Sequence, residues 1–409
     1  MTPTPVTFAS PVAPAGYAWE ATTEQVAARY GLDPTTIVRF DLNTSPSPPA
    51  VAARVLAEGR FDVPLSEYPP SDYRRLVEAA AAVYRVEPDE ILVGAGADEV
   101  LDLCAKAFLP PSGTAVVPTP TYAMYRVLSE QRPATVVAVH RRPASDGWRL
   151  DQEALRSAAV GADLVWLCDP NNPTGQAEPE GSLDALLDAI AADAAAAGRP
   201  APTIVVDEAY AEFVGRAAVV RHRRWPNVVT VRTLSKAYAV AGARVGFAIA
   251  ARPTIARLEP YRPPGSVSVP SVAVGTAVLR DPTSLAENLA RIETERPRLA
   301  AALTALGWRV APSVTNFLLV DFEAPARAAA VAEALLRRGL VPRTFGAGHV
   351  LAGCLRFTVR ASAENDRLVE AARAIAAEMD AEDPTGAAVA GSAGAATERT
   401  VTYGGEERR

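Results

Sequence analysis

Residues Val228 to Phe247 read VVTVRTLSKAYAVAGARVGF. The β-branched residues at the start of this stretch are typical of a buried strand, and a polar turn with Ser235 and Lys236 follows them. The alanine-rich residues after the turn predict the beginning of a helix. Lys236 is therefore expected at the carboxyl end of a strand, where open α/β sheets bind their ligands.

The position of Lys236 gives it a possible chemistry. A lysine amine held partly out of water loses some preference for the charged form, so it can be neutral near physiological pH and attack a carbonyl to form a Schiff base. Ser235 and Arg244 can both bind an anion close to that amine. A Ser-Lys turn by itself is more often an ordinary surface turn, so the assignment depends on the rest of the chain.

The chain is long enough for a large domain plus a smaller one, and its composition is that of a globular protein. The chain has 409 residues, of which 49% are hydrophobic and 22% charged, and its net charge is −6 without any Lys/Arg block. These values argue against a nucleic-acid or anionic-membrane surface. The chain has no apolar run of about 18 residues and no signal peptide at its start, so we expect a soluble, cytoplasmic protein.

Cysteine and histidine residues are scattered along the chain. Their spacing favours buried thiols over disulfides and offers no zinc-ligand pair, so no metal site is expected. These residues are Cys104, Cys168, Cys354, His140, His222 and His349.

Strand and helix patterns alternate from Ile91 to Val231, which predicts an α/β fold with a mostly parallel sheet and helices on both faces. Each apolar strand ends in polar or aromatic residues. Because the carboxyl ends of parallel strands meet at one edge of a sheet, we expect these residues to converge there. They are Ala97 and Asp98, Tyr122, Asn172, Asp207, and Ser235 with Lys236.

The converging residues suit one cofactor. Asp207 follows a buried run, where a carboxylate needs a cationic partner such as the protonated ring nitrogen of a bound cofactor. Tyr122 can stack on a flat ring, and Asn172 and Tyr210 can hydrogen-bond a ring hydroxyl. The free amides at a helix start form an anion site. With Lys236 as Schiff-base lysine, this set describes a pyridoxal 5'-phosphate site. The expected phosphate contacts are Ala97, Asp98, Thr233, Ser235 and Arg244.

The expected organisation of the chain has five segments. They are an N-terminal arm, partly disordered, at 1–36; a small-domain and substrate-loop segment at 37–65; a large cofactor-binding domain at 66–300; a small α+β domain at 301–379; and a disordered tail at 380–409. Within the arm, a short helix is expected from Thr22 to Tyr30, ended by Gly31.

Several motifs resemble those of the fold-type I, class I/II aminotransferases. They are NNPTG at 171–175, DEAY at 207–210, and TLSKAYAVAGARVGF at 233–247. Supporting matches are GADE at 96–99, PTYAMY at 120–125 and LRFTV at 355–359. Within this class, the chain is most similar to the histidinol-phosphate aminotransferase family. The resemblance extends from about Phe40 to Met379.

The resemblance implies a ping-pong transamination in a homodimer, with Lys236 as the catalytic lysine, a small-molecule amino donor and 2-oxoglutarate as the acceptor. It implies that Arg356 binds the substrate anion and that Arg343 makes a second contact with it. It also implies that Asn43 belongs to a substrate-facing segment. Tyr68 is expected to come from the neighbouring subunit and to contact the cofactor phosphate.

Three segments depart from the family pattern and leave the amino donor open. The family usually has Asn-Glu-Asn-Pro where this chain has NTSP at 43–46, and Arg-Pro-Leu-Gly where it has RTFG at 343–346. Arg360 replaces a small residue. The alternatives are an aminotransferase for aromatic or specialised-metabolite amino acids and an enzyme similar to the O-phosphothreonine decarboxylases. A non-enzymatic regulatory module is disfavoured because Lys236 is present.

Overall fold

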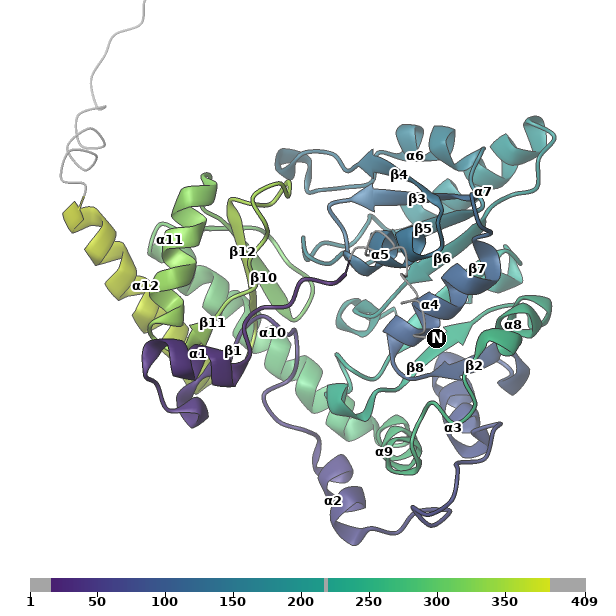
Figure 1. The fold of residues 1–409 in the computed structure, drawn as a ribbon, viewed down its shortest axis with the longest axis horizontal. Helices are drawn as coiled ribbons and strands as arrows, with labels where there is room; N and C mark the ends of the chain where they lie inside the picture. Colours follow the sequence, from purple (N-terminus) through teal and green to yellow (C-terminus); the bar gives the residue numbers. More distant parts are fainter. Residues whose placement is uncertain (1–15, 217–219, 383–409) are drawn as a thin grey trace, which may run out of the picture.

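The computed structural model describes residues 16–216 and 220–382. Its main sheet has the strand order β2-β8-β7-β6-β5-β3-β4 (Figure 1). Strands β3 to β7 run parallel to one another, and β8 runs antiparallel to both of its neighbours. The bounds are β2 Ile91–Gly94, β3 Thr114–Thr119, β4 Thr135–His140, β5 Leu164–Cys168, β6 Thr203–Asp207, β7 Val228–Thr233 and β8 Gly246–Ile249. The predicted mostly parallel sheet is confirmed.

Helices cover both faces of this sheet because its central strands alternate apolar side chains between two cores. Trp166 of β5 packs in one cluster with Leu101 of α4. Its neighbour Val165 packs in another cluster with Leu186 of α7. The helices of this larger part are α3 Arg74–Tyr84, α4 Ala97–Phe108, α5 Met124–Gln131, α6 Gln152–Ala159, α7 Ser182–Ala196, α8 Arg252–Leu258 and α9 Val269–Leu279.

A smaller α+β part packs around a separate apolar cluster. It contains an antiparallel sheet in the order β12-β10-β9 and a parallel pair of β1 with β11. The bounds are α1 Thr23–Tyr30, β1 Val38–Arg39, β9 Arg309–Val310, β10 Phe317–Asp321, α11 Pro325–Leu336, β11 Leu340–Val341, β12 Cys354–Thr358 and α12 Ser362–Glu382. Short 3-10 turns lie at 34–36, 88–90, 144–146, 211–214, 221–223, 241–243 and 259–261.

Two segments connect the larger and smaller parts. Helix α10, Pro282–Ala305, runs between them in Figure 1. The domain boundary predicted at residue 300 falls inside this helix. The segment at 37–65 contributes to both, because Phe40 packs in the smaller core whereas Val51, in helix α2 (Ala50–Glu58), packs in the larger one. The carboxyl edge of the larger sheet faces the smaller part, since Lys236, which follows β7, and Arg356 of β12 line one pocket.

The helix predicted after Lys236 is wrong. The chain forms only a 3-10 turn at 241–243 and then returns as β8, antiparallel to β7. Ala239 and Arg244 have positive φ angles, 57° and 52°, which a right-handed helix cannot contain. These two residues turn the chain back, so the polar turn of Lys236 stays at the edge of the sheet.

The predictions for the termini have different outcomes. The helix of the N-terminal arm is confirmed as α1, which ends at Gly31 with φ 67°. The remainder of the predicted disordered arm, residues 1–15, lies outside the described residues. Residues 383–409 of the predicted tail also lie outside them, and the first residues of that tail continue α12 to Glu382.

Candidate active site

A pocket of about 520 Å³ opens at the carboxyl edge of the main sheet. The predicted residues that follow β2, β3, β5, β6 and β7 all line it, which is the convergence expected from the strand pattern. The predicted site residues in its lining are Asn43, Ala97, Asp98, Tyr122, Asn172, Asp207, Tyr210, Thr233, Ser235, Lys236, Arg244, Arg343 and Arg356.

Lys236 presents its amine to this pocket. Its Nζ donates a hydrogen bond to the carbonyl oxygen of Leu42 at 3.4 Å. Burial, and then the positive charge of Arg356, lower the pKa of the Lys236 amine to about 8. A sizeable neutral fraction is therefore present slightly above neutral pH, as a nucleophilic lysine requires.

Asp207 ends strand β6 and is buried. The backbone N–H of Ala209 donates to its Oδ1 at 3.0 Å, and the hydroxyl of Tyr125 donates to its Oδ2 at 2.7 Å. Burial raises the pKa of the Asp207 carboxyl to about 6, and these two hydrogen bonds oppose the rise. Among the described residues, no Lys, Arg or His nitrogen lies within 4.0 Å of this carboxylate, so a cationic partner would complete the site.

The expected phosphate contacts surround the start of helix α4. Because α4 begins at Ala97, its first backbone amides have no partner within the helix. Arg244 Nη2 donates to Asp98 Oδ2 at 3.2 Å, which holds the guanidinium over this helix end. On the other side, the hydroxyl of Thr233 donates to Ser235 Oγ at 2.9 Å. The helix amides, the guanidinium and the two hydroxyls form a cup of groups that can donate hydrogen bonds to an anion, so a phosphate here stays a prediction.

A second group of hydrogen bonds organises the side of the pocket opposite the cup. Asn43 has a positive φ of 53° and is buried, and its Nδ2 donates to the hydroxyl of Tyr210 at 2.9 Å. Arg356 Nη1 donates to Asn172 Oδ1 at 2.6 Å. Asn43 thus orients Tyr210, and Asn172 orients Arg356.

Arg356 is a buried cation without a carboxylate partner. Its guanidinium lies 5.3 Å from the ring centroid of Phe317 and donates to two neutral acceptors, Asn172 Oδ1 and the carbonyl oxygen of Asp41. No Asp or Glu carboxylate oxygen of the described residues lies within 4.0 Å of it, and its Nε has no hydrogen-bond partner. A buried charge of this kind is stabilised by a bound anion.

An N-terminal strap at 16–20, which sequence reasoning missed, crosses the mouth of the pocket. Tyr17, Trp19 and Glu20 line it. Glu20 Oε1 accepts hydrogen bonds from the backbone N–H and the hydroxyl of Thr344, both at 2.8 Å. Arg343 donates to the carbonyl oxygen of Ala18 at 2.7 Å and lies 3.6 Å from Glu20. The strap is therefore attached to the segment that departs from the family pattern.

Tyr68 does not line the pocket of its own chain. Its side chain is 89% exposed. Its predicted contact with the cofactor phosphate of a neighbouring subunit stays a prediction.

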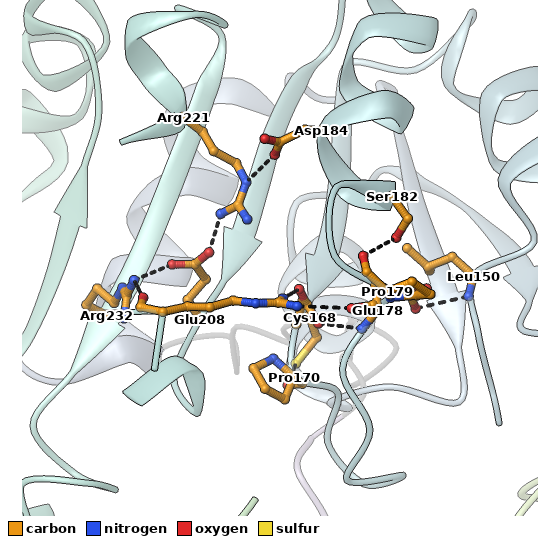
Figure 2. A network of polar contacts seen from close by, with 12 residues as sticks. Leu150, Cys168, Pro170, Glu178, Pro179, Ser182, Asp184, Glu208, Arg221 and Arg232 are labelled. Atoms are coloured by element: carbon orange, nitrogen blue, oxygen red, sulfur yellow. Dashed lines mark hydrogen bonds and ion pairs between the residues drawn. The ribbon is translucent and has the colours of Figure 1, made fainter. Parts of the chain in front are cut away.

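Buried ion pairs support the sheet next to the site (Figure 2). Figure 2 shows Glu208, the residue after Asp207, between Arg221 and Arg232. Arg232 also pairs with Glu212 at 3.1 Å, and all four side chains are at most 5% exposed. Because losing one partner would leave a buried charge unpaired, this network fixes the end of β6 relative to β7.

Other possible site types have no support in the described residues. No three His, Cys, Asp or Glu side chains there are grouped for metal binding. All three cysteines are buried free thiols. None of the described helices combines the length and apolar character that crossing a bilayer requires.

Comparison with known proteins identifies the family. The family model "Aminotransferase class I and II" matches residues 39–375, and this chain belongs to that family. Enzymes of the family use pyridoxal 5'-phosphate, so the chain is a pyridoxal-phosphate-dependent aminotransferase. The predicted fold class, family and cofactor are confirmed.

The relatives carry one name. A histidinol-phosphate aminotransferase of Symbiobacterium thermophilum is 39% identical over 360 residues, which cover 86% of this chain and 93% of the relative. One from Roseiflexus castenholzii is 36% identical over 364 residues, with the same coverages. The crystal structure of histidinol-phosphate aminotransferase from Sinorhizobium meliloti in complex with pyridoxal-5'-phosphate matches with a TM-score of 0.79 at 25% identity. That match covers 88% of this chain and 96% of the other.

Proposed function

We propose that this enzyme transfers the amino group between histidinol phosphate and 2-oxoglutarate in histidine biosynthesis. The observation that carries the proposal is the buried guanidinium of Arg356, which lacks a carboxylate partner among the described residues and lines the same pocket as Lys236. A planar donor fork at this position suits a phosphate and a carboxylate in turn. The names of the relatives support histidinol phosphate as the amino donor and do not favour the alternatives.

The pocket fits pyridoxal 5'-phosphate because each charged part of the cofactor has a matching group. Asp207 would hold the ring nitrogen, and Tyr122 would lie against the ring. Asn172 and Tyr210 would hydrogen-bond the ring hydroxyl. When bound, the ring withdraws electrons from the substrate Cα and weakens the bond to its proton. The phosphate would be held by Ala97, Asp98, Thr233, Ser235 and Arg244.

Lys236 is proposed to move the proton during the reaction. Its free amine has a pKa of about 8, so a sizeable neutral fraction is available to accept a proton once the substrate amine has replaced it on the cofactor. The neutral Nζ would remove the proton from the substrate Cα as a general base and, as a general acid, would deliver it to the carbonyl-derived carbon of the bound cofactor rather than back to Cα, so that the amino group is retained when the keto acid leaves. Arg356 favours the neutral form of this amine while it binds the substrate anion, so one residue serves both tasks.

Arg343 and Asn43 are proposed to shape the substrate side of the pocket. Arg343 approaches the anion from the strap side, but its charge is partly offset by Glu20 at 3.6 Å. Asn43 acts through Tyr210, whose hydroxyl accepts its amide hydrogen bond. We expect Arg343 to contribute less to substrate affinity than Arg356.

The test is a half-reaction. Purified holoenzyme is mixed with histidinol phosphate without keto acid, and the visible absorbance of the bound cofactor is followed. We expect the band to be lost at low concentrations of histidinol phosphate. Histidinol, which lacks the phosphate, and phenylalanine should require much higher concentrations. Lys236→Ala should abolish turnover, and retained transamination in that variant would overturn the assignment of the catalytic lysine.

Two other outcomes would change the substrate. If the band persists with histidinol phosphate and is lost with glutamate, the enzyme acts on a different amino donor, and the segments at 43–46 and 343–346 would be where to look for its specificity. Release of carbon dioxide from O-phosphothreonine without keto-acid formation would identify a decarboxylase.

A homodimer is proposed in which Tyr68 of one subunit completes the site of the other. The support is its exposed side chain, which does not line the pocket of its own chain. Mixing Lys236→Ala subunits with Tyr68→Ala subunits, each nearly inactive alone, tests this. Random exchange should restore up to about a quarter of the wild-type rate, because half of the dimers then contain one intact site. No recovery after demonstrated exchange would show that Tyr68 does not act across a dimer interface.

A further inference from the structure

Tyr125 contacts the Asp207 carboxylate from behind the pocket. It lies in the first turns of helix α5, is completely buried, and does not line the pocket itself. Its hydroxyl donates to Asp207 Oδ2 at 2.7 Å, while the backbone N–H of Ala209 donates to Oδ1 at 3.0 Å. Each carboxylate oxygen thus accepts one hydrogen bond from the protein and retains a further lone pair.

The ring of Tyr125 is fixed by a closed set of contacts. It stacks on Trp166 with 5.3 Å between the ring centroids and an interplanar angle of 11°. The indole Nε1 of Trp166 donates to Ser129 Oγ at 3.0 Å, and that hydroxyl donates to the carbonyl oxygen of Tyr125 at 2.7 Å. Tyr122 packs edge-on against the same ring at 5.7 Å. The direction of the Tyr125 hydroxyl is therefore determined by the surrounding core.

We propose that Tyr125 is a positioning residue that fixes both the orientation and the charge of Asp207 for its interaction with the cofactor ring nitrogen. This inference rests on the proposed role of Asp207. A buried carboxylate that accepts only one hydrogen bond can rotate and take up a proton. A carboxylate that accepts two hydrogen bonds stays ionised and keeps its orientation. A cationic ring nitrogen needs the ionised form.

The electrostatic surroundings of Asp207 agree with this role. Burial raises the pKa of its carboxyl to about 6, and the Tyr125 hydrogen bond is the largest effect opposing that rise. The other groups that influence the carboxyl or face it are Asp98, which raises its pKa, Lys236, which lowers it, and the neutral side chains of Cys168 and Tyr210. Without the Tyr125 hydroxyl, the pKa should rise further, towards neutral pH.

Tyr125→Phe tests the proposal because it keeps the stacked ring and removes only the hydroxyl. Tyr84→Phe is the matched control: Tyr84 is also buried and packs edge-on against Phe247, but its hydroxyl has no hydrogen-bond partner. The first measurement uses the cofactor-free enzyme. Infrared difference spectra during a pH titration follow the protonated carboxyl band, and Asp207→Asn assigns the contribution of Asp207.

We expect the pKa of Asp207 to rise in Tyr125→Phe and to stay unchanged in Tyr84→Phe. The dissociation constant for pyridoxal 5'-phosphate at neutral pH should increase about tenfold or more in Tyr125→Phe, as for other hydrogen bonds to a charged group. The kcat should fall, with a smaller change in the KM of the amino donor. The KM should change less than kcat because Tyr125 does not line the substrate pocket.

Two results would overturn the proposal in distinguishable ways. If Tyr125→Phe matches Tyr84→Phe in the pKa of Asp207 and in cofactor affinity, Tyr125 is only a packing residue. If Asp207→Asn itself retains wild-type cofactor affinity and rates, the proposed role of Asp207 is wrong, and the role of Tyr125 is lost with it.

Discussion

Arg343 and Arg356 pair through their backbones, each N–H donating to the carbonyl oxygen of the other at 3.0 Å. This antiparallel bridge brings both guanidinium groups to one pocket from two segments of the smaller part. Only one of the two positive charges is offset by a nearby carboxylate. Glu20 lies 3.6 Å from Arg343, whereas Arg356 has no carboxylate within 4.0 Å among the described residues. The unpaired cation is the one placed beside Lys236.

Replacing Arg356 should weaken the binding of both substrates. For Arg356→Gln, we expect the KM of the amino donor and of the keto acid to rise at least about tenfold, since a charge-assisted contact to the substrate anion is lost. The pKa of Lys236 should also rise above its value of about 8, because the positive charge of Arg356 lowers it. Steady-state kinetics and the pH dependence of amine acylation in the cofactor-free enzyme measure the two effects.

Arg343→Gln is the control for this experiment. It removes the same charge from the same pocket, but a charge already offset by Glu20. Its KM should rise less than that of Arg356→Gln. An equal rise in the two variants would show that the pairing with Glu20 has no consequence for substrate binding.

Removing the carboxylate of Glu20 should release the strap from the pocket mouth. Glu20→Ala removes the two 2.8 Å hydrogen bonds from Thr344. It also removes the negative charge that offsets the guanidinium of Arg343. We expect a severalfold change in the KM of the amino donor, with a loss of unfolding free energy of about 1–2 kcal/mol, because two part-buried hydrogen bonds are removed. Glu24→Ala, on the exposed face of α1, changes the net charge equally and should leave KM unaltered.

The buried carboxyl of Asp207 should make the cofactor-free enzyme less stable as pH rises. Its pKa increases from 3.8 to about 6 on folding, so between these values the folded state binds more protons than the unfolded state. Stability from this group is therefore present at low pH and is lost as pH rises through about 6. Relative to Asp207→Asn, the wild-type unfolding free energy should fall by up to about 3 kcal/mol across this window. Denaturant unfolding at several pH values measures it, and parallel curves for the two proteins would contradict the assigned pKa.

Sequence patterns predicted the residues at strand ends because parallel strands deliver their carboxyl ends to one edge. Lys236, Asp207 and Asn172 were found in this way, and all line the pocket. The strap could not be predicted from strand patterns, because Glu20 and Thr344 are 324 positions apart and neither belongs to a periodic pattern. Nothing in the local sequence shows that the chain joins them.

Two further features depend on tertiary structure. Tyr125 appears in the sequence as an ordinary apolar-face residue of a helix, and its bond to Asp207 spans 82 positions. The alanine-rich residues after Lys236 have high helix propensity, yet the left-handed conformation of Ala239 and the pairing of β8 with β7 prevail. The helix propensity of these residues is therefore outweighed by the pairing of the returning strand with its neighbour.

Gly246 allows that returning strand to approach the proposed phosphate cup. A Cβ at this position would lie 2.4 Å from the carbonyl carbon of Gly96 and 2.6 Å from the backbone nitrogen of Ala97. Both are backbone atoms at the start of α4, so Gly246→Ala must displace the helix amides. We expect a loss of about 1–3 kcal/mol in unfolding free energy, as for other overpacked sites, and weaker cofactor binding. Gly242→Ala is the matched control, since its added Cβ meets no atom within 4 Å. Thermal unfolding and cofactor titration compare the two variants, and unchanged cofactor affinity in Gly246→Ala would show that the start of α4 does not hold the phosphate.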